Sequence, residues 1–293
     1  RIVIGPLFNE SVKYLDELED MTFISLTNKI YGNPSNVISA GVNAISQIST
    51  IIKYRKLNNI ERSIFLIPKT DYKKEIDLAI KKTNIKLKDK FYYDTDPTLL
   101  TAQIEKLTRY SQRKQNLKDE IKNLENSLVQ NKKKIENLKK RDTLGGINFD
   151  SVIIADFDEG LKSVATSLLY TDVSSKRISY LTLNQWFDES LLKETSLHPI
   201  YFPSINKENF DLFINEYSSL YESIPNQISF LSYDLVGLIY YLIYKNDFKI
   251  SDKIFYKKNK FKGKIGIFEI NKNVITHQLN FYSIDNKEFK KIF

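Results

Sequence analysis

Short runs of β-branched and aromatic residues alternate along most of the chain with longer amphipathic segments. The runs, which we expect to form strands, are 2–4, 22–25, 63–67, 91–94, 152–155, 178–183 and 200–202. The amphipathic segments, whose apolar residues recur every three or four positions, are 11–18, 42–57, 72–80, 161–170, 210–221 and 230–244. Such spacing places the apolar residues on one face of a helix. The alternation predicts an α/β fold in which helices flank parallel sheets.

The end of the chain follows a different pattern. Residues 264–270 and 274–279 are rich in apolar residues and flank the turn residues Asn271, Lys272 and Asn273. Two such runs on either side of a short turn predict a β-hairpin.

A heptad pattern interrupts the alternation between residues 112 and 141. Its seam positions, spaced alternately four and three residues apart, are Leu117, Ile121, Leu124, Leu128, Asn131, Ile135 and Leu138. Asp96 followed by Pro97 is typical of a helix start, and a continuous helix from there to Arg141 would be roughly 65 Å long. We expect this coiled-coil arm to bury its seam, with Asn131 fixing the register. The seam would pair with a second molecule, or within an antiparallel hairpin that turns at 126–131.

The positive charge is concentrated in the same segment. The chain has a net charge of +8, and residues 112–141 hold ten Lys or Arg and four Asp or Glu, a net charge of +6. In a DNA-binding zipper, a basic region precedes the seam, whereas here the basic residues are interleaved with it. The pattern therefore argues against nucleic acid as a partner.

Composition excludes several other classes of protein. The 293 residues are 42% apolar and 27% charged, which is typical of a globular protein, and the length favours two domains. The chain has no Cys, which excludes disulfides, thiolate metal sites and a cysteine nucleophile. The longest apolar run, 235–244, is about half the length that spans a bilayer.

The loops that follow the expected strands are the candidate binding positions, because ligands bind outside the carboxyl ends of parallel strands. These loops are 8–11, 26–28, 69–72, 156–159 and 184–186. They carry mainly hydroxyl, amide and aromatic groups, which favour hydrogen bonding and stacking around a small polar ligand over proton transfer. Some of these residues, such as Ser11, Asp71 and Asp158, are also good helix N-caps.

Known catalytic motifs are missing or incomplete. There is no Walker loop and no G-x-G-x-x-G, and Ser190 to Lys193 matches S-x-x-K without a K-T-G partner. His198 and His277 each lack a second imidazole at ligand spacing, and the acidic loop 156–159 is better explained as a helix cap than as a cation site. We expect no enzymatic activity, no cofactor and no metal.

Three stretches after residue 148 resemble a known fold. They read FDSVIIADFDEGLKSVATSLLYTDV, ISYLTLNQWFDESLL and SFLSYDLVGLIYYL, and they resemble the type I periplasmic binding fold of branched-chain amino acid receptors. The opening IVIGPLFNESVKYLDELEDMTFISLTN is similar to the third strand, helix and fourth strand of that fold. The nearest subgroup is the penicillin-binding protein activator family, whose members carry a similar helical insertion.

The resemblance implies two α/β lobes joined by three crossover strands, with a ligand in the cleft between them. Lobe 1 would comprise 1–37 and 204–262, and lobe 2 would comprise 38–203 and 263–293, with the coiled-coil insertion at 97–143. Lobe 1 would lack its N-terminal strands. The strand at 2–4 would then be an exposed apolar edge, which we expect another chain or segment to cover.

The resemblance also implies the ligand-binding residues and the function. The ligand-binding residues are Ser11, Ser25, Thr27, Tyr72, Asp156, Gln185 and Trp186. We expect a non-enzymatic protein of the periplasm or of an outer-membrane-anchored envelope layer, whose signal segment would precede the given sequence. It would act, like the activator family, by contacting a cell-wall synthase or another envelope protein. The alternative is a substrate-binding receptor of an ABC importer for small amino-acid-like solutes.

Overall fold

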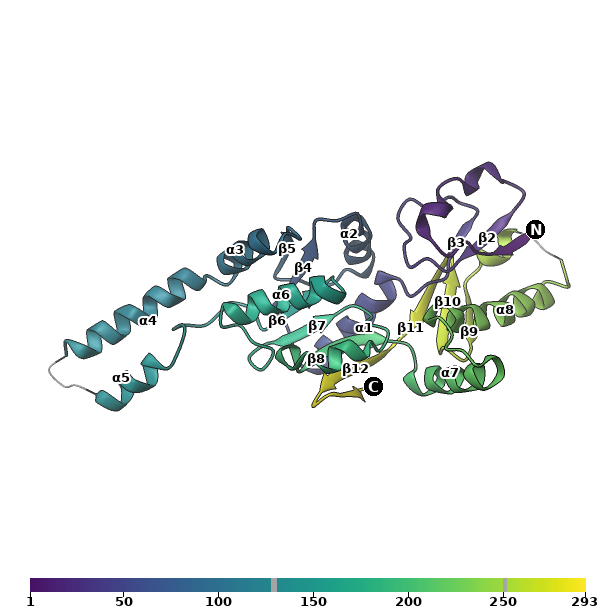
Figure 1. Ribbon diagram of the computed structural model, residues 1–293. Coiled ribbons are helices and arrows are strands. Elements are labelled where there is room, and N and C mark those ends of the chain that lie inside the picture. The colour runs from purple at the N-terminus through teal and green to yellow at the C-terminus, as the bar shows by residue number, and fades with distance from the viewer. Residues whose placement is uncertain (128–130, 250–251) are drawn as a thin grey trace.

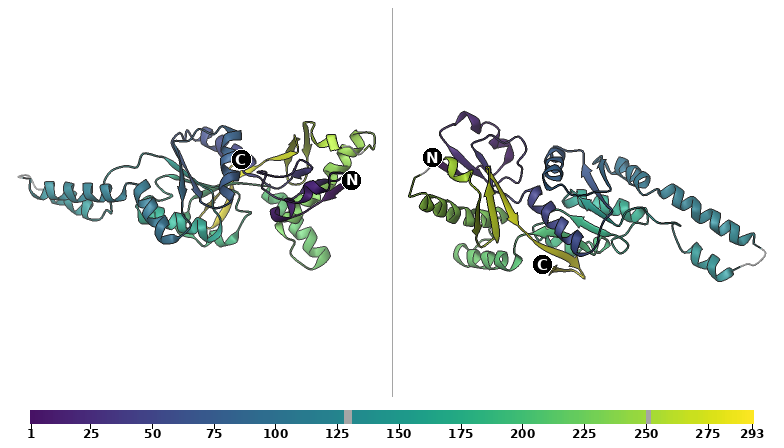
Figure 2. Two further views of the ribbon diagram at one scale, coloured as in Figure 1. Left: turned by 90° about the horizontal axis from the view of Figure 1, so that it is seen from above. Right: turned by 180° about the vertical axis from the view of Figure 1, so that it is seen from behind.

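The computed structural model describes residues 1–127, 131–249 and 252–293. Two α/β lobes lie side by side, and a helical arm extends from the far end of one of them (Figure 1). The views from above and from behind show the same elongated arrangement (Figure 2). Among the described helices, none combines the length and apolar character needed to cross a membrane.

Lobe 1 contains a six-stranded sheet. In spatial order its strands are β1 (Ile2–Ile4), β2 (Thr22–Ser25), β3 (Val37–Ser39), β11 (Val274–Gln278), β10 (Ile267–Asn271) and β9 (Asn259–Lys262). The first four are parallel, and β10 and β9 are added antiparallel. Helices α7 (Lys207–Tyr221) and α8 (Gln227–Lys245) belong to this lobe, and η5 (Asp252–Phe255) precedes β9.

Lobe 2 contains a seven-stranded sheet. Its strands are β13 (Glu288–Lys291), β12 (Asn280–Asp285), β8 (Ile200–Ser204), β7 (Ser179–Thr182), β6 (Ser151–Ile154), β4 (Ser63–Pro68) and β5 (Asp89–Tyr93). The strands from β8 to β5 are parallel, whereas β12 and β13 are antiparallel. The 3-10 helices η3 (Glu189–Leu192) and η4 (Thr195–Leu197) lie between β7 and β8.

Both faces of the lobe 2 sheet are covered by helices. Alternate residues of β4 point to opposite faces, so Phe65 packs with α1 (Ala44–Leu57) and α2 (Tyr72–Thr83). Leu66 belongs to the other core, with α3 (Pro97–Leu107) and α6 (Asp158–Tyr170). A sheet buried on both faces explains why its strands are continuous apolar runs rather than alternating ones.

The expected elements match the structure closely, apart from two of the helices. The strands and the hairpin of β10 and β11 form as predicted, and the fold class is confirmed. The segment 11–18 was expected to be helical but forms two short 3-10 turns, η1 (Asn9–Val12) and η2 (Leu15–Glu17). Val12 is the buried residue of these turns, which is too little apolar contact to support a helix.

The arm is not one continuous helix. It is broken into α3, α4 (Tyr110–Glu125) and α5 (Lys132–Lys139), and the first break is at Arg109, which adopts a left-handed backbone with φ of 53°. Helix α4 runs outwards and α5 returns beside it (Figure 1). Asn131 is the N-cap of α5, accepting a hydrogen bond from the Lys134 backbone, and is not a polar seam position. Leu128 lies outside the described residues.

The strand pairing bears on the lobe boundaries, which stay a proposal. Strands β10 and β11 pair with β3 in lobe 1, although the sequence analysis placed 263–293 in lobe 2. Helix α3 packs into the lobe 2 core through Leu100 and Ile104, so the protruding arm begins at α4. We propose that lobe 1 comprises 1–40 and 205–278, that lobe 2 comprises 41–204 and 279–293, and that the arm spans 110–141.

Strand β1 lies at the edge of the lobe 1 sheet. It pairs with β2 on one side, and no strand among the described residues pairs with its other side. Val3 and Ile4 are 37% and 43% exposed. What covers this edge stays a prediction.

Candidate binding cleft

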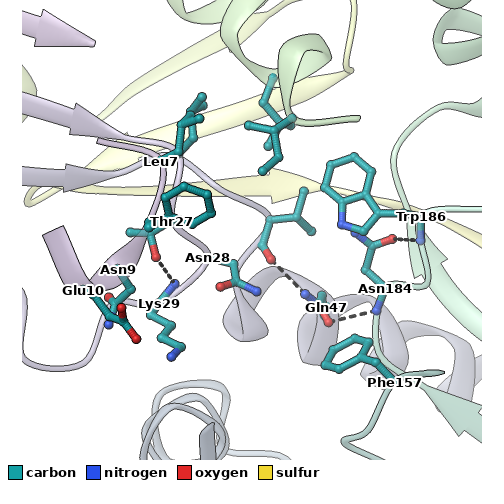
Figure 3. A pocket seen from close by; sticks show the side chains of 15 residues that line it. Leu7, Asn9, Glu10, Thr27, Asn28, Lys29, Gln47, Phe157, Asn184 and Trp186 are labelled. Atoms are coloured by element: carbon teal, nitrogen blue, oxygen red, sulfur yellow. Dashed lines mark hydrogen bonds between the residues drawn. The ribbon is translucent and has the colours of Figure 1, made fainter. Parts of the chain in front are cut away.

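A cavity of about 550 Å³ lies between the two lobes. Its lining residues come from loops at the ends of strands in both sheets and from the first turns of α1 and α8 (Figure 3). They are Leu7, Phe8, Asn9, Glu10, Leu26, Thr27, Asn28, Lys29, Val42, Gln47, Phe157, Asn184, Trp186, Ile228 and Leu231. The volume and the mixture of apolar, aromatic and amide groups suit a small organic ligand.

Four of the five predicted loops reach this cavity, but only some of the predicted residues line it. Thr27 and Trp186 are part of the lining, whereas Ser11, Tyr72 and Asp156 are not. Ser11 is exposed on the turn η1. The loop 69–72 contributes nothing to the lining.

Ser25 and Thr27 shape the first wall of the cleft. The buried Ser25 hydroxyl donates to the Pro6 carbonyl at 2.7 Å, which ties the loop after β1 to β2. The Thr27 hydroxyl oxygen accepts a hydrogen bond from the Lys29 backbone at 3.2 Å. Asn33 donates to the Lys29 carbonyl at 2.8 Å. These bonds give the loop after β2 a fixed shape.

Asn184 is the centre of a buried network at the second wall. Its Oδ1 accepts hydrogen bonds from the Trp186 backbone at 3.0 Å and from the Ser204 hydroxyl at 2.8 Å. Its backbone N–H donates to Oε1 of Gln47 at 3.0 Å, and Gln47 in turn donates to the Val42 carbonyl. The Asn184 side chain is 3% exposed, and its Nδ2 donor has no partner.

A second cavity of about 820 Å³ adjoins the first. Phe157, Asn184 and Trp186 line both cavities and therefore form their shared boundary. Gln185 lines only the second cavity, and its amide donates to the Thr182 hydroxyl at 3.1 Å.

Asp156 and Tyr72 contact other residues of the protein and do not line the cavity. The Asp156 carboxylate accepts hydrogen bonds from the Tyr93 hydroxyl at 2.5 Å and from the Phe157 backbone at 2.9 Å. Burial and the adjacent carboxylate raise the pKa of Tyr93. The Tyr72 ring lies beside Phe157, and its buried hydroxyl has no partner. Burial raises the pKa of Tyr72 as well.

Sequence reasoning missed Gln47, Ile228 and Leu231, because they lie on helices rather than in strand-end loops. Gln47 was detectable, since it adjoins Ile48 on the buried face of α1, where a polar side chain is unusual. The charged lining residues are Glu10 and Lys29, and the other polar side chains of the lining are hydroxyl, amide and indole groups that suit hydrogen bonding and stacking. Within the described part of the chain, no cluster of His, Asp or Glu is placed to hold a metal ion.

Comparison with known proteins identifies the fold. No family model matches the chain, and no curated protein matches it. An ABC transporter substrate-binding protein from Desulfitobacterium hafniense, solved with Leu, is 12% identical with a TM-score of 0.62, covering 99% of this chain and 80% of that one. The C-domain of LpoA from Haemophilus influenzae, a regulator of PBP1A, is 8% identical with a TM-score of 0.58, covering 100% and 82%.

A putative branched-chain amino acid ABC transporter protein from Rhodospirillum rubrum is 12% identical with a TM-score of 0.59, covering 94% of this chain and 74% of that one. At these identities the likeness defines the fold alone. The chain has the type I periplasmic binding fold, as its sequence resemblance predicted.

Proposed function

We propose that the protein is a non-enzymatic component of the cell envelope that acts, like the activator subgroup, by contacting a cell-wall synthase or its assembly. The observation that carries this proposal is the arm, which is fixed to lobe 2 and extends beyond it (Figure 1). The regulatory role of LpoA, which has the same fold, supports the proposal.

Arg113 fixes the base of the arm. Its buried guanidinium donates to the Thr171 carbonyl at 3.0 Å and to the Thr143 hydroxyl at 2.7 Å. It also forms an ion pair with Asp172 at 3.6 Å. Burial lowers the pKa of Arg113, although Asp172 opposes that effect. These contacts join α4 to the end of α6, so the arm has a defined direction from the lobe.

The exposed surface of the arm is basic. Lys114, Lys118 and Lys122 are exposed and lie four residues apart on α4, which places them in one stripe. The apolar residues Leu117, Ile135 and Leu138 are buried within the arm. A partner would therefore be recognised by charge, and its matching surface would be acidic.

Crosslinking of the full chain to envelope extracts from its host tests this proposal. We expect the wild type to crosslink to a cell-wall synthase or its partner, and a variant with Lys114, Lys118 and Lys122 replaced by Glu to lose that crosslink. The matched control replaces the exposed Lys81, Lys82 and Lys88 on lobe 2 by Glu and should retain it. No crosslink from the wild type, or equal loss in both variants, would contradict the proposal.

A second function, a receptor for small amino-acid-like solutes, is supported by Asn184. A buried donor without a partner costs about 1–3 kcal/mol, and a ligand with a carbonyl or carboxylate oxygen would remove that cost.

A thermal-shift screen that includes leucine and 4-hydroxybenzoate tests this function. A ligand at 100 times its dissociation constant should add about 2.7 kcal/mol to the free energy of unfolding. The gain should be absent in Asn184→Ala and retained in Ser190→Ala, and no shift with any solute would reject the function.

A further inference from the structure

We propose that Glu75 is a clasp that holds the two lobes closed without a ligand. Glu75 lies on α2 of lobe 2 and is 2% exposed. Its Oε2 accepts hydrogen bonds from the backbone N–H groups of Ile30 and Tyr31, each at 2.8 Å. Both donors belong to the loop between β2 and β3 of lobe 1, which faces α2 across the gap between the lobes (Figure 1).

The arrangement of donors is specific to the closed form. Two successive backbone N–H groups that point to one side form a small anion-binding concavity, and a carboxylate oxygen satisfies both at once. Neither donor belongs to the lobe of Glu75, so the bonds exist only while the lobes are together. In an open form, water would take the place of each partner. The clasp therefore contributes to lobe closure rather than to the folding of either lobe alone.

The loop that Glu75 holds is also a wall of the cleft. Thr27, Asn28 and Lys29 line the cavity immediately before the two clasped residues. On the other side of the cavity, Gln227 of lobe 1 donates to the Trp186 carbonyl of lobe 2 at 3.2 Å. Side chains of the protein itself thus bridge the lobes on both sides of the cavity. In a receptor that closes on its solute, the solute would form such bridges instead.

The position of Tyr72 agrees with this inference. Tyr72 was expected to contact a ligand from lobe 2, but its hydroxyl is buried beside Phe157 and does not line the cavity. Glu75 lies one helical turn further along α2, where it meets lobe 1 directly. The surface of α2 that faces lobe 1 is therefore occupied by a contact between the lobes.

Distance measurement between spin labels tests the clasp without any added solute. The chain has no Cys, so Lys13→Cys on lobe 1 and Lys82→Cys on lobe 2, both at exposed positions, can be labelled uniquely. We expect one narrow, short distance in the otherwise unchanged protein. Glu75→Ala should broaden the distribution and shift it to longer distances, and Glu75→Gln, which keeps the shape and loses the charge, should give a mixture of both.

The matched control is Asp77→Asn on the same helix. Asp77 contacts Lys73 and Tyr92 within lobe 2, so this variant should keep the short distance. Thermal unfolding followed by circular dichroism shows whether each variant is folded. If Glu75→Ala does not fold, the distance distribution of Glu75→Gln tests the clasp in its place. An open distribution in the unchanged protein, or the same short distance in all folded variants, would overturn the inference. Because neither partner nor ligand is added, the outcome does not depend on the proposed function.

Discussion

At the scale of single residues, His277 shows how the chain segments that cross between the lobes are held together. It lies near the end of β11, just before the chain crosses to β12 in lobe 2. Its ring Nε2 donates to the Ala40 carbonyl at 3.0 Å, and its backbone N–H donates to the Ser46 hydroxyl at 2.8 Å. The Nδ1 atom has no partner. The residue thus connects two of the segments that pass from one lobe to the other.

Burial lowers the pKa of His277 to about 4, despite the hydrogen bond to Ala40. As the pH falls below 6.5, the unfolded chain binds a proton at this residue before the folded chain does. The stability that the neutral ring provides is therefore complete above pH 6.5 and is lost as the pH falls towards 4. This loss is about 3 kcal/mol in the free energy of unfolding.

Urea unfolding of the wild type and His277→Gln at pH 7, 5.5 and 4.5 measures that loss. Carboxylates contribute to the pH dependence of both proteins, so the difference between them isolates the histidine. We expect the stability of the wild type to fall more steeply than that of the variant. Parallel curves would mean that the folded chain binds a proton at His277 as readily as the unfolded chain does.

At the scale of elements, the arm shows how an apolar seam is buried within one chain. Leu117, Ile135 and Leu138 are buried, and Lys134 pairs with Glu120 at 2.8 Å across α4 and α5. The seam is therefore covered by the returning helix, and a second molecule has little apolar surface left to bury.

We expect light scattering to give the mass of one chain, 34.3 kDa, for both the wild type and Leu124→Glu. The half-buried Leu124 lies near the end of α4, so a charge there weakens the arm without creating or removing an oligomer. A wild-type dimer that becomes monomeric on this change would show instead that the seam joins two molecules.

The elements also show what the sequence could and could not predict. Periodic apolar residues located α1, α2, α6, α7 and α8, because each of these helices is amphipathic against its own sheet. The break at Arg109 had no strong local signal, since neither Gly nor Pro lies near it, although its left-handed backbone has a φ of 53°. Strand β12 was missed because Asn280, Ser283 and Asp285 interrupt its apolar residues, so the segment shows neither a continuous apolar run nor a regular alternation.

The same limit applies to the cleft. The rule that ligands bind beyond strand ends located four of the loops that form it, because that rule depends only on topology. It could not show that Ser25 and Asp156 would be hydrogen-bonded internally, since their partners Pro6 and Tyr93 are distant in sequence.

At the scale of the whole molecule, the arm and the lobes are separate units. The buried residues of the arm belong to none of the hydrophobic clusters that form the lobe cores. Replacing residues 117–139 by a short Gly-Ser linker, which keeps Arg113, should change the melting temperature by less than about 3 °C, because about 1 kcal/mol at most is lost from the lobes. Calorimetry checks this, and a fall of about 10 °C would show that the arm supports the lobe 2 core.

The edges of the two sheets differ in one respect that bears on how molecules meet. Edge strands β5, β9 and β13 each carry charged residues, such as Lys90, Lys260 and Lys290, and charges on an edge discourage the addition of another strand. The edge strand β1 is Ile2-Val3-Ile4 and carries none. Among the described edge strands β1 is the one without a charged side chain, so a pair formed through β1 would present only charged edges and would not grow into a fibre.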